Sequence, residues 1–271
     1  MGVSKSGFLA WRQRAPSRRA LEDARLAKLI EDVHEGSLGV YGAPRIHVEL
    51  REAHGVRVGR KRVARLMREK GIQGVHRRRQ GRPLDPGARE PVYDDLVRRD
   101  FSADAPDKVW VADLTQHRTK EGWLYLAAVM DVFHRRIVGW SMGRHMQTEL
   151  VVDAVEMAVT NRRPAPGLIH HSDRGSQYGS LVFGQRLTRS GIVGSMGSKG
   201  DAYDNAAMES FFATLQTELL DRREWETVAE LESAIFHFIE VFYNRKRRHS
   251  SLGYLSPQEF ANRYAQQKAA A

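Results

Sequence analysis

Residues 167–180, GLIHHSDRGSQYGS, and residues 198–220, SKGDAYDNAAMESFFATLQTELL, are the stretches that decide the fold of this chain. In the first, a short apolar run leads into Asp173 and a glycine turn. A buried strand that ends in an acidic residue and a glycine is how open α/β sheets present side chains to a ligand. In the second, apolar residues recur at helical spacing, and Glu209 lies at the edge of that apolar face. These apolar residues are Met208, Phe211, Phe212, Leu215 and Leu219.

A third carboxylate ends another expected strand. Asp113 closes the apolar run of residues 109–112, VWVA, so the three acids have the spacing D-x59-D-x35-E. Burying a charge is costly unless the charge is paired or bound to a metal. Carboxylates that converge from two strands and a helix therefore predict a site for hard divalent cations with oxygen ligands, Mg²⁺ or Mn²⁺.

The order of the remaining elements predicts the fold class. Apolar runs at residues 109–119, 123–133 and 135–142 are separated by short polar turns, which favour antiparallel neighbours. The periodicity then predicts alternating helices and strands as far as the Glu209 helix: a helix at 148–160, a strand at 168–171, a helix at 180–189 and a strand at 192–195. The prediction is an α/β protein with a mixed sheet, three antiparallel strands followed by α-β-α-β-α, which is the ribonuclease-H-like order.

Five motifs in this order resemble one known family. They are DLT at 113–115, GWLYLAAVMDVFHRRIVGW at 122–140, LIHHSDRGSQY at 168–178, DNAAMESFF at 204–212 and YNRKRRHSSLGYLSP at 243–257. They are similar to insertion-sequence transposases of the IS-three family, of the OrfB type, which carry a retroviral-integrase-like DDE catalytic core. The resemblance runs from about residue 41 to about residue 260.

The resemblance implies a ribonuclease-H-like core with two Mg²⁺ or Mn²⁺ ions and no nucleotide cofactor. Asp113, Asp173 and Glu209 would be both the catalytic residues and the metal ligands, with Asp113 touching both ions and the others one each. Such a site performs phosphoryl transfer on DNA and needs no Ser or Cys nucleophile. Asp131 also ends a strand and is interpreted as structural. His170 and His171, next to Asp173, could support a ligand, contact DNA or be packed and hydrogen-bonded.

Composition and charge exclude some classes of protein and indicate a binding partner. The 271 residues contain no cysteine, which excludes disulfides and cysteine-based zinc sites. No apolar run approaches the length of a membrane span, and no signal peptide is evident, so we expect a cytoplasmic, nucleoid-associated bacterial protein. The net charge is +10. The whole excess of cations falls in residues 1–100, which suggests a polyanion-binding module beside a neutral catalytic one.

The N-terminal part predicts short helices. Residues 1–20 are basic and irregular, and amphipathic helices are expected at 21–34, 45–53 and 59–70. Two short helices joined by a glycine-containing turn suggest a helix-turn-helix, with the last as recognition helix. The alternative is a small helical bundle with solvated charges. Candidate DNA contacts on that helix are Arg60, Lys61, Arg62 and Arg65.

Further candidate DNA contacts lie in the second half of the chain. Arg174 and Lys199 are on loops that flank the predicted site. Gln216 occupies a position, seven residues after Glu209, where the family usually has a basic residue that is thought to hold donor DNA. Four consecutive cations suit a phosphate backbone contact, although a solvated basic helix end would look the same. They are Arg245, Lys246, Arg247 and Arg248.

These observations predict a basic helix-turn-helix-like region at 1–80, a linker at 81–106, a catalytic core at 107–222 and a C-terminal helical basic segment at 223–271. The expected function is metal-dependent cleavage and strand transfer of transposon ends into target DNA. The family implies a homo-multimeric synaptic complex, and an upstream helix-turn-helix partner joined by frameshifting. The alternatives are a ribonuclease-H-type nuclease, a non-enzymatic DNA-binding regulator and an inactive relic. The last is considered because Gln216 replaces the basic residue that is usual in the family.

Overall fold

The computed structural model describes residues 4–76, 92–98, 100–197 and 206–270. The chain divides into two compact units, residues 1–75 and residues 76–271. In the described part no helix is both long and apolar enough to span a bilayer.

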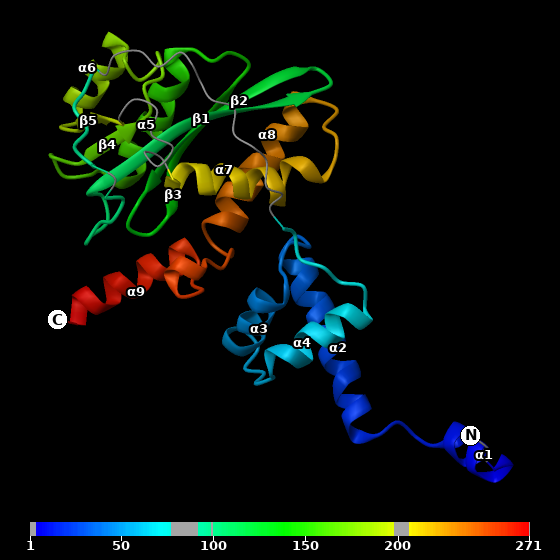
Figure 1. Ribbon diagram of the computed structural model, residues 1–271. Helices are drawn as coiled ribbons and strands as arrows, with labels where there is room; N and C mark the ends of the chain where they lie inside the picture. The colour runs from blue at the N-terminus through cyan, green and yellow to red at the C-terminus, as the bar shows by residue number, and fades with distance from the viewer. Residues whose placement is uncertain (1–3, 77–91, 99, 198–205, 271) are drawn as a thin grey trace. The chain divides into compact units, whose positions relative to one another are not determined.

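The first unit is helical (Figure 1). Its helices are α1 (Lys5–Gln13), α2 (Arg18–Gly36), α3 (Ala43–Glu52) and α4 (Arg60–Glu69). Helices α2, α3 and α4 contact one another around a small apolar core that includes Ile30, Ile46 and Val63. Helix α1 corrects the prediction that residues 1–20 are irregular. Ser4 caps it by accepting a hydrogen bond from the Gly7 N–H (3.2 Å), although α1 buries none of its residues.

The second unit is built on one five-stranded sheet. Its strands are β1 (Val109–Thr119), β2 (Gly122–Asp131), β3 (Arg136–Gly143), β4 (Ile169–Ser172) and β5 (Val193–Met196). Their order is β3-β2-β1-β4-β5, with β1, β2 and β3 antiparallel and β4 and β5 parallel to β1. Helices α5 (Thr148–Arg162), α6 (Leu181–Arg189) and α7 (Ala206–Glu218) complete the predicted α-β-α-β-α series. The ribonuclease-H-like fold class is confirmed.

One face of the sheet is covered by α5. Strand side chains alternate between faces, and Trp110, Ala112 and Val129 belong to the core that includes residues of α5. Gly139 of β3 lies directly under this helix, because a Cβ there would be 2.2 Å from the Ala154 carbonyl oxygen. The close approach of helix and strand therefore requires glycine at this position.

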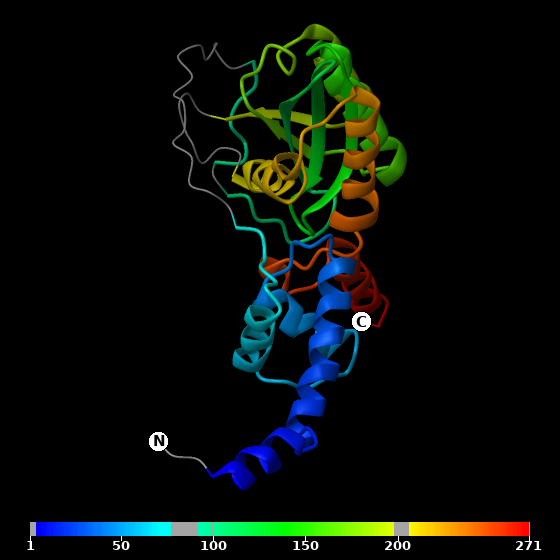
Figure 2. The same ribbon diagram turned by 90° about the vertical axis from the view of Figure 1, so that its right-hand side faces the viewer.

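The opposite face of the sheet carries α7. This helix contacts β1, and in both Figure 1 and Figure 2 it (yellow) lies next to the strands (green). The odd-numbered residues of β1, including Asp113, point to this face because their even-numbered neighbours face α5. Helix α8 (Val228–His237) covers the same face farther along, since Phe236 packs edge-on against Trp140 of β3 at 5.9 Å.

The C-terminal segment continues beyond α8. A π-helical turn, Phe238–Tyr243, and a 3-10 turn, Ser250–Leu252, lead to α9 (Pro257–Ala270), which the periodicity did not predict. The N-terminus of α9 nevertheless has a readable signal. The Glu259 N–H donates to Ser256 Oγ (3.2 Å), and the Ser256 N–H donates to Glu259 Oε2 (2.7 Å), which is a capping box followed by proline at the first helical position.

Candidate active site

Asp113 and Asp173 are brought together by the register of two parallel strands. Val111 of β1 pairs with His171 of β4, so each aspartate stands two residues beyond the same pair. Neighbouring strands lie about 4.8 Å apart, which places the two carboxylates side by side at the carboxyl edge of β4. Adjacent strands of an open α/β sheet commonly present ligand-binding groups at this edge.

The surroundings of Asp113 disfavour its charged form. Its carboxylate accepts a hydrogen bond from the Leu114 N–H (2.7 Å). The pKa of Asp113 is raised from 3.8 to about 7, chiefly by burial and then by the negative charge of Asp173, while the hydrogen bond from the Leu114 N–H partly opposes both. A pair of neighbouring carboxylates, one of them with a strongly raised pKa, is typical of a site that receives positive charge from a ligand.

The loop after β4 fixes the orientation of Asp173. The Gly175 N–H donates to Asp173 Oδ1 (3.0 Å), and a Cβ on Gly175 would lie only 3.0 Å from the same oxygen. Arg174, a predicted DNA contact, donates from Nε to the Gly197 carbonyl oxygen (2.9 Å). The arginine therefore ties the Asp173 loop to the end of β5.

Glu209 lies in the first turn of α7, on the same face of the sheet as Asp113, and is half-buried. Among the residues described, no three His, Asp or Glu side chains are grouped so that they could hold a metal ion. The structure thus brings Asp113 and Asp173 together and places Glu209 on the helix that contacts β1, without joining all three into one ligand cluster.

Tyr178 is a residue near the carboxylates that the sequence reasoning missed. Its ring is fully buried, and its hydroxyl has no hydrogen-bond partner in the described part of the chain. Burial raises the pKa of Tyr178 well above its usual value, and the charges of Asp113 and Asp173 add to the effect. The sequence feature that could have identified Tyr178 is its position in the motif LIHHSDRGSQY, which also contains Asp173.

The two histidines before Asp173 have different surroundings. His170 is packed against Phe183 (5.3 Å between ring centroids), and neither of its ring nitrogens has a hydrogen-bond partner among the described residues. Burial lowers the pKa of His170 to about 4, so the ring is neutral at pH 7. His171 Nδ1 lies 2.9 Å from Ser195 Oγ. His170 is thus packed but not hydrogen-bonded, whereas His171 is both.

Asp131 lies away from this site, as expected of a structural residue. It pairs with Trp110 near the start of β1, accepts hydrogen bonds from the N–H groups of Asp107 (2.6 Å) and Phe133 (2.9 Å), and is fully buried. Its carboxylate closes the turn that follows β2.

Gln216 is engaged within the protein. Its amide donates a hydrogen bond to the Asp221 carboxylate, in the short turn after α7. The charge of Asp221 also acts on His117 of β1, although burial is the larger influence and lowers the pKa of that histidine. Lys199, the other predicted DNA contact near the site, lies outside the described residues.

The four C-terminal cations divide into two pairs. Arg245 and Lys246 are exposed, whereas Arg247 and Arg248 are only 6% exposed. Arg247 forms a two-pronged ion pair with Glu218 of α7 (2.7 Å for both contacts), and Arg248 donates to the Tyr254 carbonyl oxygen (3.1 Å). Arg247 and Arg248, which were predicted to contact a phosphate backbone together with Arg245 and Lys246, thus have partners within the protein and little exposed surface.

The cations of α4 also differ from one another. Arg62 Nε and Arg65 Nη2 both donate to the carboxylate of Asp23 on α2 (2.6 Å each). These hydrogen bonds lower the pKa of Asp23. Arg60 and Lys61 at the start of α4 are exposed. Two of the four predicted contacts thus link α4 to α2, and two extend into solvent.

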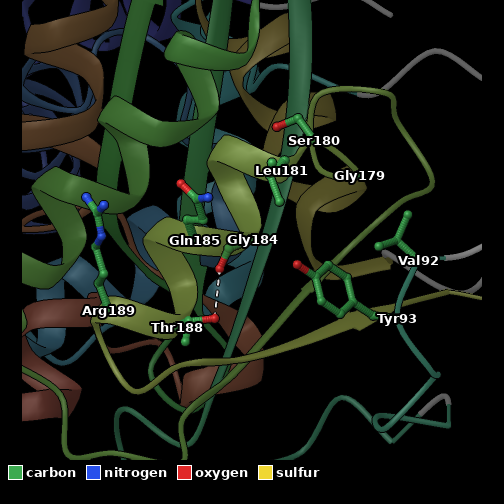
Figure 3. Close-up of a pocket in the computed structure, with 9 residues that line it drawn as sticks. All are labelled: Val92, Tyr93, Gly179, Ser180, Leu181, Gly184, Gln185, Thr188 and Arg189. Atoms are coloured by element: carbon green, nitrogen blue, oxygen red, sulfur yellow. Dashed lines mark hydrogen bonds between the residues drawn. The ribbon is translucent and has the colours of Figure 1, made fainter.

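A hollow of about 570 Å³ lies beside α6 (Figure 3). Tyr93 forms one wall, with its ring against β5, where a Cβ on Gly194 would lie 2.8 Å from the ring. Figure 3 shows the Tyr93 hydroxyl directed toward Gly184 of α6. The exposed Leu181 (77%) lines the other side. The residues before β1 thus cover the edge strand of the sheet.

Comparison with protein families gives three matches. An HTH-like domain matches residues 20–80, and two Integrase core domain families match residues 103–202 and 190–257. Among solved structures, the HTLV-2 integrase catalytic core domain in complex with magnesium is 16% identical, with a TM-score of 0.45 over 59% of this chain and 99% of that chain.

Relatives match along nearly the whole chain. The insertion element IS600 uncharacterized 31 kDa protein of Shigella sonnei is 44% identical over 99% of this chain and 98% of its own. The transposase for insertion sequence element IS904 of Lactococcus lactis is 42% identical, covering 91% of this chain and 97% of its own. Transposase InsF for insertion sequence IS3A of Escherichia coli is 38% identical, covering 96% and 91%. The chain belongs to the IS3 family of insertion-sequence transposases, with an HTH-like domain and an integrase core.

Proposed function

We propose that this protein cleaves DNA at the ends of an insertion sequence and joins the resulting 3′ ends to target DNA, in a reaction that requires divalent cations. The observation that carries the proposal is the pair Asp113 and Asp173. The two carboxylates end adjacent parallel strands, and their repulsion and burial raise the pKa of Asp113 to about 7. Two carboxylates this close together repel each other, and a bound Mg²⁺ or Mn²⁺ would offset that repulsion.

The donor set fits a hard divalent cation. Both groups are carboxylates, the ligands that Mg²⁺ and Mn²⁺ prefer, and backbone N–H groups already orient them. We propose that Asp113 and Asp173 hold the ions together with Glu209, which comes from the helix on the same face of the sheet. Two bound ions would activate the attacking hydroxyl and stabilise the leaving 3′ oxygen.

The remaining side chains would position DNA. Arg60 and Lys61 on α4 and Arg245 and Lys246 after the π-helical turn are exposed cations, suited to phosphate contacts. For Gln216 to contact donor DNA, its amide would have to leave the Asp221 carboxylate. We further propose that two or more copies act together, because two ends have to be joined in concert, and that an upstream helix-turn-helix protein can take part.

A strand-transfer assay tests the proposal. A labelled duplex with the element end is incubated with a target plasmid and Mg²⁺ or Mn²⁺, with and without the upstream helix-turn-helix protein. Asp113→Asn, Asp173→Asn and Glu209→Gln should each abolish product while leaving end binding intact in a filter-binding assay. Asp153→Asn, which changes an exposed carboxylate of α5, is the matched control and should behave like wild type.

Three results would count against the proposal. Equal product from wild type and Asp173→Asn would remove the assigned site. Product in the presence of EDTA would remove the metal requirement. End binding without any product, even with the upstream protein and Mn²⁺, would favour a DNA-binding regulator or an inactive relic.

A further inference from the structure

The second unit contains a cavity of about 860 Å³ at the edge of the sheet opposite to Asp173. Residues 105–108, immediately before β1, and residues 162–165, between α5 and β4, form one part of it. Strands β1 and β4 both begin at this edge. With a rise of about 3.3 Å per residue, Lys108 lies about 16 Å along β1 from Asp113. The cavity is thus separate from the candidate active site, and α9 forms its other side.

The lining is strongly basic. It contains one acidic residue, Asp107, and five cationic ones: Lys108, Arg136, Arg162, Arg163 and Lys268. The carboxylate of Asp107 is already occupied, because Arg162 contacts it through Nε (3.0 Å) and Nη2 (2.6 Å). The other four positive charges therefore have no neutralising carboxylate in the lining.

Two side chains in this cavity have polar groups without an internal partner in the described part of the chain. Arg136 is half-buried and forms no ion pair within the described part of the chain. Burial and the nearby Arg162 lower its pKa, and the charges of Glu240 and Asp107 oppose this only in part. His134 is 1% exposed, and its Nε2 atom has no hydrogen-bond partner among the described residues. Its Nδ1 lies 3.4 Å from the Arg136 backbone nitrogen and 3.6 Å from Asp131 Oδ1. A partly buried cation without an ion pair and a buried ring nitrogen without a hydrogen bond are both costly unless a ligand completes them.

An aromatic surface adjoins the cations. Phe133, between β2 and β3, packs edge-on against Tyr264 of α9, with ring centroids 4.7 Å apart, and both rings line the cavity. Both are only partly buried. Cavities of roughly 300–1,000 Å³ hold small ligands, and a partly open aromatic face suits a nucleobase. Duplex DNA is too wide for such a volume, whereas a single nucleotide is not.

We propose that this cavity binds a nucleoside phosphate, with the phosphate held by Arg136, Lys108, Arg163 and Lys268 and the base against Phe133 and Tyr264. The ligand is either a free nucleotide or the terminal nucleotide of a DNA strand, since both present the same chemistry. The site is independent of the assignment of Asp113, Asp173 and Glu209.

The test is calorimetric titration of the full-length protein with deoxyadenosine monophosphate and, separately, with inorganic phosphate. Wild type should bind the nucleotide more tightly than phosphate. Arg136→Gln and Lys268→Gln should each weaken nucleotide binding about tenfold or more, as expected for loss of one charge-assisted hydrogen bond. Arg118→Gln makes the same charge change on an exposed residue of β1 outside the cavity, and should leave binding unchanged.

Several outcomes would overturn the proposal: no binding of the nucleotide by wild type, equal binding of nucleotide and phosphate, or equal losses in Arg136→Gln and Arg118→Gln. Misfolding is controlled by thermal unfolding without ligand. Arg136→Gln should change the melting temperature little, because it removes repulsion from Arg162 as well as attraction to Glu240 and Asp107. Lys268→Gln changes an exposed residue of α9 and provides a second variant. Competition by a 5′-phosphorylated oligonucleotide would assign the site to a strand end, and its absence to a free nucleotide.

Discussion

Replacing Asp113 by asparagine should stabilise the metal-free protein at neutral and alkaline pH. The pKa of Asp113 is raised from 3.8 to about 7, chiefly by burial and then by the charge of Asp173. The folded state therefore keeps its proton between these two pH values while the unfolded state has lost it. Stability consequently decreases as pH rises from about 4 to about 7 and stays at the lower level above that.

The structure sets the size of this effect. The difference between the two pKa values is about three, and one pKa unit corresponds to about 1.4 kcal/mol, so Asp113 costs up to about 4 kcal/mol of unfolding free energy above pH 7. That is a large share of the roughly 5–15 kcal/mol by which domains are stable. With a urea dependence near 2 kcal/mol per molar, the unfolding midpoint of Asp113→Asn should rise by up to about 2 M at pH 8.

The assay is urea unfolding with EDTA present, followed by tryptophan fluorescence, at intervals between pH 4 and pH 8. Trp110, buried in the same strand, reports on the second unit. Wild type and Asp113→Asn should coincide near pH 4 and separate as pH rises, and Asp173→Asn should show a smaller gain. Asp153→Asn serves as control and should follow wild type. Parallel curves for wild type and Asp113→Asn at every pH would refute the reasoning.

Three further predictions concern packing. Gly139→Ala should lower the unfolding free energy by about 3 kcal/mol or more, because its Cβ would lie 2.2 Å from the Ala154 oxygen. Glu218→Gln should cost about 3–5 kcal/mol in urea unfolding, because it leaves the buried Arg247 without its counter-ion. His170→Phe should be neutral or stabilising at pH 7. It should also remove a stability loss of up to about 3 kcal/mol that wild type undergoes from pH 6.5 to about 4, because the pKa of His170 is lowered to about 4.

The first two predictions have matched control variants, and the third has a result that would contradict it. Gly36→Ala adds the same methyl group where no atom lies within 4 Å, and a loss as large as that of Gly139→Ala would contradict the steric explanation. Glu224→Gln breaks an exposed pair with Lys120 (3.8 Å) and should cost less than about 1 kcal/mol. An acid-induced loss in His170→Phe equal to that of wild type would assign the loss to other groups.

Periodicity determined much of the second unit. Apolar runs with short polar turns predicted three antiparallel strands, and the alternation that follows predicted the parallel strands and the helix with Glu209. These signals are local, because the spacing of apolar residues along a strand or helix indicates which of its side chains are buried. The N-terminus of α9 was equally local, since Ser256 and Glu259 form a capping box that the prediction overlooked.

The sequence by itself also indicated which acidic residues to consider. Only the tertiary structure showed that their surroundings differ. Asp113 and Asp131 both end apolar runs. One stands beside a second carboxylate across a parallel strand pair, whereas the other closes a turn through two backbone N–H groups. Arg245 and Arg247 are two positions apart and chemically identical, yet one is exposed and the other is paired with Glu218, 29 residues away. Charge, burial and partnership depend on contacts between residues distant in the chain, which spacing along the sequence does not encode.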